Sequence, residues 1–64
     1  MLRFTKAEAN KALEDYGLNW ESPFIDIVDT LTDALEEHYL HQGSHIDSDD
    51  AIERATTLAH LWAK

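Results

Sequence analysis

The apolar residues of this chain recur at helical spacing in three segments. The clearest stripe falls within 23–42, where one helical face collects Phe24, Ile27, Val28, Leu31, Ala34, Leu35 and His38. The opposite face of the same segment is acidic and holds Asp26, Asp29, Asp33, Glu36 and Glu37. No stretch of useful length alternates with the period of two that a half-buried strand requires. The pattern therefore predicts an all-α protein with helices at about 6–16, 23–42 and 48–63.

Residues that favour helix starts precede the first two segments. Thr5 with Glu8 three positions later is typical of a capping box, in which each side chain bonds to the backbone N–H of the other residue. Ser22 before Pro23 predicts a hydroxyl N-cap followed by proline in the first helical position, where its missing N–H costs nothing.

The other helix ends carry equally local signals. Gly17 stands where a helix commonly ends in a left-handed residue, and Leu18 behind it suits a Schellman motif. The middle helix should likewise stop at Gly43. Either Asp47 or Ser48 is expected to cap the last helix, whose acidic first turn complements the positive end of the helix dipole.

Short connections make neighbouring helices roughly antiparallel, so we expect a small three-helix bundle that forms a single helical domain over 1–64. Alanines four residues apart in the last segment would let another helix approach closely; they are Ala51, Ala55 and Ala59. The predicted core comprises Phe4, Leu13, Tyr16, Leu18, Trp20, Phe24, Ile27, Val28, Leu31, Leu35, Ile46, Ile52, Leu58 and Trp62.

Chain length and composition exclude several classes of function. A chain of 64 residues leaves little core to support a catalytic cleft, so we expect neither an enzyme nor a cofactor. The absence of cysteine excludes thiol catalysis, disulfides and thiolate zinc sites, and it fits a reducing, cytoplasmic location. Apolar runs are only a few residues long, too short for a membrane span or a secretory signal.

Charge is both strongly negative and unevenly distributed. Thirteen acidic residues against five basic ones give a net charge of −8. Between positions 12 and 53 there is no Lys or Arg, yet twelve of the thirteen carboxylates lie there. Such a surface repels nucleic-acid phosphates and anionic membranes, and the last helix offers only Arg54, with Lys64 beyond it, for DNA contact. The distribution suggests a cationic protein partner; the alternative is a face that serves solubility alone.

Three histidines follow one another at a spacing that a metal site could use. His38, His41 and His45, with Asp47 as a fourth ligand, could hold zinc or nickel. The competing interpretation places His38 toward the core, and it treats imidazoles near a helix C-terminus as favourable to the dipole without any metal. We predict no metal site and keep a histidine-based, metal-responsive regulator as an alternative.

A few apolar residues fall outside the predicted core faces. Leu40 lies within the acidic face, Ile25 lies at its border, and Leu61 projects away from the inner stripe of the last helix. If these side chains join Trp20 or Tyr39 in space, they form the kind of patch that marks a protein contact.

In size, acidity, absence of cysteine and capped three-helix pattern, the chain resembles the small accessory proteins that bacteriophages make early in infection or induction. The resemblance implies binding to a host protein, in some such proteins by imitation of the charge of DNA, and it assigns no site residue. Our leading hypothesis is a non-enzymatic module that binds a basic surface, such as that of a DNA-handling host protein. Its predicted partner-binding residues are Asp26, Asp29, Asp33, Glu36, Glu37, Leu40, Tyr39 and Leu61. The alternative is a helical homodimer or structural subunit that makes contact through Leu40, Tyr39, Leu61 and Trp62.

Overall fold

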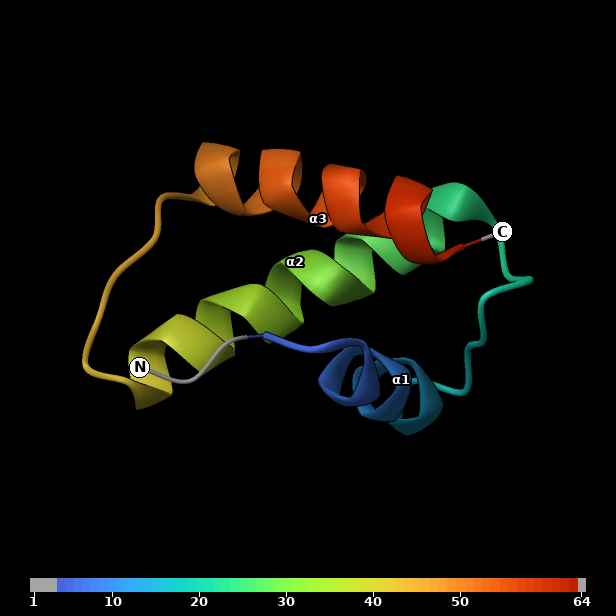
Figure 1. Ribbon diagram of the computed structural model, residues 1–64, viewed down its shortest axis with the longest axis horizontal. Coiled ribbons are helices and arrows are strands. Elements are labelled where there is room, and N and C mark those ends of the chain that lie inside the picture. Colours follow the sequence, from blue (N-terminus) through green and yellow to red (C-terminus); the bar gives the residue numbers. More distant parts are fainter. Residues whose placement is uncertain (1–3, 64) are drawn as a thin grey trace.

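The computed structural model describes residues 4–63, so Arg3 and Lys64 lie outside the described residues. Three helices follow one another in the chain (Figure 1): α1 (Lys6–Asp15), α2 (Phe24–His41) and α3 (Ser48–Trp62). Residues 4–63 contain no strand. The predicted all-α, three-helix fold is confirmed, and each helix end lies within one residue of its predicted position. Within the same residues, no helix is both long enough and apolar enough to cross a membrane.

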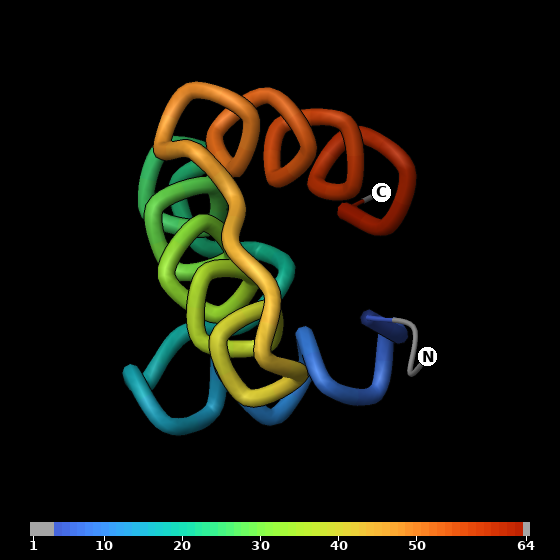
Figure 2. The backbone as a smooth tube through the Cα atoms, turned by 90° about the vertical axis from the view of Figure 1, so that its left-hand side faces the viewer, coloured from blue at the N-terminus to red at the C-terminus, as the bar shows by residue number. Residues whose placement is uncertain are grey.

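Helix α2 is the centre of the molecule. Helix α3 runs antiparallel along it, whereas α1 crosses α2 on the other side (Figure 1). Viewed from the side, α3 lies above and α1 below the long axis of α2, and these two helices make few contacts with each other (Figure 2). The expected antiparallel packing therefore holds for α2 and α3 but not for α1, and one side of α2 is left without a neighbouring helix.

The core collects one face of each helix. Its buried members are Ala9, Leu13, Ile27, Val28, Leu31, Leu35, Ala55 and Ala59. The alanine series of α3 is fully buried, as predicted, because methyl side chains allow the two helix backbones to approach closely. Around this core pack partly buried side chains, including Phe4, Leu18, Trp20, Leu58 and Trp62.

Three predicted core side chains are instead exposed, by 60% for Tyr16, 42% for Phe24 and 48% for Ile52. Tyr16 follows the last residue of α1 and forms its C-cap, beyond the turns that contact α2. Phe24 is the first residue of α2, and its ring lies 4.8 Å from the ring of His60. In the part of α3 that holds Ile52, the buried positions are instead the alanines Ala51 and Ala55.

The C-terminal signals are confirmed. Gly17 has a φ of 72°, and the N–H of Leu18 donates to the carbonyl of Leu13 at 2.8 Å, which is the long bond of a Schellman motif. Gly43 ends α2 in the same way with a φ of 74°.

The N-terminal signals are confirmed only in part. Thr5 Oγ accepts the backbone N–H of Glu8 at 3.4 Å, but the Glu8 carboxylate is directed to α2 rather than back to Thr5. The prediction of Ser22 as an N-cap is wrong, since its hydroxyl accepts the N–H of Asn19 at 3.1 Å and closes the preceding turn. Pro23 is therefore the N-cap itself, and the helix begins one residue later than predicted.

Candidate functional site

The carboxylates of α2 form one continuous surface. We call Asp26, Asp29, Asp33, Glu36 and Glu37 the acidic face. All are exposed except the half-buried Glu36. Residues three and four apart on a helix lie about 5–6 Å from each other, so the face is a regular row of negative charge. The face lies opposite the apolar residues of α2 that pack in the core, and Figure 2 shows no helix on the outer side of α2. At its edges the face approaches the other helices, since Glu37 lines a hollow together with Lys11 of α1 and Glu36 bonds to Ser48 of α3.

The acidic face has no cationic partner within residues 4–63. The ion pairs there join His38 to Glu8 and His45 to Asp47, and neither involves the face. Among the described residues, Glu36 alone of the five makes a side-chain hydrogen bond, as the hydroxyl of Ser48 donates to its Oε2 at 3.4 Å. The negative charge of the face is therefore left to solvent, salt or a binding partner.

The exposed leucines do not form one patch. Leu40 is 72% exposed near the C-terminal end of the acidic face, and Leu61 is 63% exposed near the end of α3. Since α2 and α3 are antiparallel, these two helix ends lie at opposite ends of the molecule (Figure 1). Ile25, 68% exposed, lies at the start of α2, a full helix length from Leu40.

The aromatic residues considered for the patch pack inward. Tyr39 is half-buried against the core, with its ring 6.1 Å from that of His38. Trp20 and Trp62 meet edge to face at 6.1 Å, and Phe4 stacks on Trp62 at 6.4 Å. Of the apolar residues predicted to bind a partner, Leu40 alone is both exposed and adjacent to the acidic face.

His38 links α1 to α2. Its Nδ1 lies 3.1 Å from Glu8 Oε2, its Nε2 lies 2.6 Å from Gln42 Nε2, and its ring meets the edge of Phe4 at 5.5 Å. The side chain is 11% exposed, as the core interpretation of this histidine predicts. Sequence reasoning missed the partner, because Glu8 also fits a local capping role.

The other residues considered for a metal site, His41, His45 and Asp47, do not come together around His38. His41 is exposed, and His45 Nε2 lies 3.5 Å from Asp47 Oδ1 in a pair exposed on both sides. Asp47 occupies the N-cap position of α3, although its carboxylate makes no capping hydrogen bond. Among the described residues, no three His, Asp or Glu side chains lie close enough to hold a metal ion.

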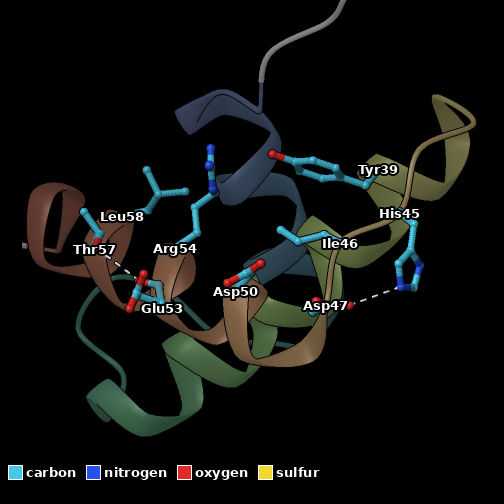
Figure 3. A pocket seen from close by; sticks show the side chains of 9 residues that line it. All are labelled: Tyr39, His45, Ile46, Asp47, Asp50, Glu53, Arg54, Thr57 and Leu58. Carbon is cyan, nitrogen blue, oxygen red and sulfur yellow. Dashed lines mark hydrogen bonds and ion pairs between the residues drawn. The ribbon is translucent and has the colours of Figure 1, made fainter.

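A hollow of about 810 Å³ lies between the α2–α3 connection and α3 (Figure 3). Ile46, predicted for the core, is half-buried here and lies outside the main core cluster. We call this the connection hollow; it is lined by Tyr39, His45, Ile46, Asp47, Asp50, Glu53, Arg54, Thr57 and Leu58. Sequence reasoning missed this hollow, because its walls depend on how two helices pack and on the path of the connection between them.

No family model, no curated protein and no solved structure matches this chain. Function must therefore be inferred from what the surface can do chemically. The acidic face can attract a cationic surface over the length of a helix, and the connection hollow can receive a side chain.

Proposed function

We propose that this protein is a non-enzymatic interaction module that binds a basic protein surface through the acidic face of α2. The observation that carries the proposal is a row of five carboxylates, four of them exposed, that makes no ion pair within the described residues. A protein groove that binds nucleic-acid phosphates presents the complementary charge, so a DNA-handling protein is the favoured class of partner. The resemblance to small bacteriophage accessory proteins adds that this partner belongs to a host cell.

The acidic face carries an energetic cost that solubility alone does not require. Its like-charged neighbours at helical spacing are Asp26/Asp29, Asp29/Asp33, Asp33/Glu36 and Asp33/Glu37. Each such pair destabilises a helix by about 0.2–0.5 kcal/mol, or roughly 1–2 kcal/mol for the four. Carboxylates dispersed over all three helices would give the same net charge without this repulsion. Their concentration on one uncovered face supports a binding role.

The test neutralises part of the face. In the variant Asp29→Asn, Asp33→Asn and Glu37→Gln, the hydrogen-bonded Glu36 and the first-turn Asp26 are left intact. Immobilised wild-type protein should capture basic proteins from a bacterial lysate at low salt, identified by mass spectrometry, and release them as salt rises. The variant should lose this capture, because it lacks three of the carboxylates that attract the basic partner. Salt should release the partner from the wild type, because attraction between exposed charges is screened beyond about 10 Å at 0.1 M salt.

The matched control removes the same charge elsewhere. Glu14→Gln, Asp15→Asn and Glu21→Gln neutralise three exposed carboxylates outside the acidic face. This variant should retain the captured proteins. Equal loss in both variants would point to net charge alone, and capture by both without salt dependence would contradict the proposal.

The homodimer alternative makes a different demand. It needs a shared apolar surface, whereas Leu40 and Leu61 lie at opposite ends and Trp62 packs inward. Two acidic faces also repel each other. Sedimentation equilibrium over a range of protein concentrations and salt should therefore report a monomer, and a stable dimer at low salt would favour the alternative.

A further inference from the structure

We propose that the connection hollow is a second binding site, which takes a short peptide segment carrying a lysine or arginine beside a leucine-sized apolar residue. The site is separate from the acidic face, and the proposal does not depend on the function assigned to that face. It follows from the apolar floor, the charged rim and one arginine without an ion pair.

Three of the side chains that line the hollow are largely apolar, and we call them its floor. Tyr39, Ile46 and Leu58 are each half-buried, and Tyr39 and Leu58 also pack against the core. Side chains fixed from behind lose little freedom when a ligand covers them, which favours binding. The floor therefore offers apolar surface to a side chain of a ligand.

The rim is negative. Asp47, Asp50 and Glu53 line the hollow together with Arg54, so the carboxylates outnumber the guanidinium by three to one. The three carboxylates are exposed. A ligand cation next to the apolar anchor therefore meets the opposite charge.

Arg54 distinguishes a peptide from a simple cation. Among the described residues its guanidinium makes no ion pair, and Figure 3 shows the side chain directed away from the carboxylates of Asp50 and Glu53. A guanidinium presents several N–H donors and no acceptor. Backbone carbonyls of a peptide would satisfy these donors, whereas a polyamine or a metal ion would repel them.

The size and shape also suit a peptide. The volume of about 810 Å³ lies in the range of ligand sites, and the hollow is partly open to solvent. Its lining side chains come from the end of α2, the connection and α3 (Figure 3). An extended segment can lie in such a hollow with both of its ends in solvent.

The probe is the blocked hexapeptide Ala-Leu-Lys-Leu-Lys-Ala, titrated into ¹⁵N-labelled protein and followed by NMR. We expect saturable shifts of the backbone amides of Ile46 and of 53–58 in α3. Two comparison peptides replace either both leucines by alanine or both lysines by glutamine. Each should bind at least about tenfold more weakly, since each lacks one half of the recognition.

Matched variants locate the site. Glu53→Lys should lower the affinity for the hexapeptide by about tenfold or more, and Glu53→Gln should lower it less. Glu21→Lys in the α1–α2 connection should change that affinity by less than about twofold. Both glutamates are exposed, so the substitutions differ in place rather than in burial. Arg54→Gln makes the hollow more negative and should nevertheless weaken binding, because the donors to the peptide carbonyls are lost.

Several results would overturn the proposal. One is an absence of NMR shifts at millimolar peptide, and another is equal affinity for the hexapeptide and for the peptide with both leucines replaced by alanine. The others are equal losses of affinity in Glu53→Lys and Glu21→Lys, and tighter binding of the hexapeptide by Arg54→Gln. The acidic-face variant at Asp29, Asp33 and Glu37 should bind the hexapeptide as the wild type does, so failure of one proposal is distinguishable from failure of the other.

Discussion

Single residues behave as predicted where one signal acts alone, and they depart from the prediction where a second bond competes for the same side chain. Gly17 adopts a positive φ because the helix end itself demands a left-handed residue. Glu8 and Ser22 carry equally strong capping signals, yet Glu8 pairs with His38 across the fold and Ser22 bonds to Asn19. Only the folded chain decides between a local bond and a competing one.

Gly17 permits a clean test of the cap. Nothing lies within 4 Å of a Cβ built at this position, so Gly17→Ala meets no steric obstacle from its surroundings. The cost is the left-handed conformation itself, about 1–2 kcal/mol for a residue with a Cβ. Urea unfolding should show that loss for Gly17→Ala and a smaller one for Gly17→Asn, because asparagine tolerates this conformation better. Equal stability of Gly17→Ala and wild type would mean that the residue leaves the left-handed region in solution.

Whole elements were predictable because periodicity is a property of one helix at a time. The stripe of α2 and its acidic face both follow from spacing within 24–41, so the helix and the candidate surface were predicted together. The crossing of α1 over α2 and the connection hollow were not predicted, since both depend on how separate elements meet. For the same reason, spacing within one helix cannot show whether Leu40 and Leu61 share a patch. The antiparallel packing of α2 and α3 places the two leucines at opposite ends of the molecule (Figure 1).

The contact of α2 with α3 makes its own prediction. Ala55 is fully buried between these helices, so Ala55→Leu adds methylenes where no space remains and should cost about 1–3 kcal/mol of unfolding free energy. Ala7→Leu makes the same change at an exposed position of α1 and should alter stability by less than about 0.5 kcal/mol. Thermal unfolding followed by circular dichroism compares the two. Similar midpoints for both variants would contradict close packing at Ala55.

At the scale of the whole molecule, the central position of α2 has two consequences. Its apolar sides hold α1 and α3, and its remaining side is left to solvent with five carboxylates on it. If α1 ran alongside both other helices, the molecule as a whole would bury more surface between its helices. The open arrangement instead presents a row of negative charge from Asp26 to Glu37, and folding must tolerate the repulsion within it.

That repulsion can be measured in the variant already designed for binding. Neutralising Asp29, Asp33 and Glu37 removes the pair Asp29/Asp33 and both pairs of Asp33 with glutamate, along with the interaction of Asp26 with Asp29. The unfolding free energy should stay unchanged or rise by up to about 1–2 kcal/mol at 0.01 M salt, where the screening length is about 30 Å. The gain should vanish near 1 M salt, where that length is about 3 Å. Equal or higher stability with lost capture of a basic partner would identify a surface kept for binding at the expense of folding. Lower stability would instead mean that these carboxylates form favourable contacts within the fold, and the binding role would then pass to Leu40 and the connection hollow.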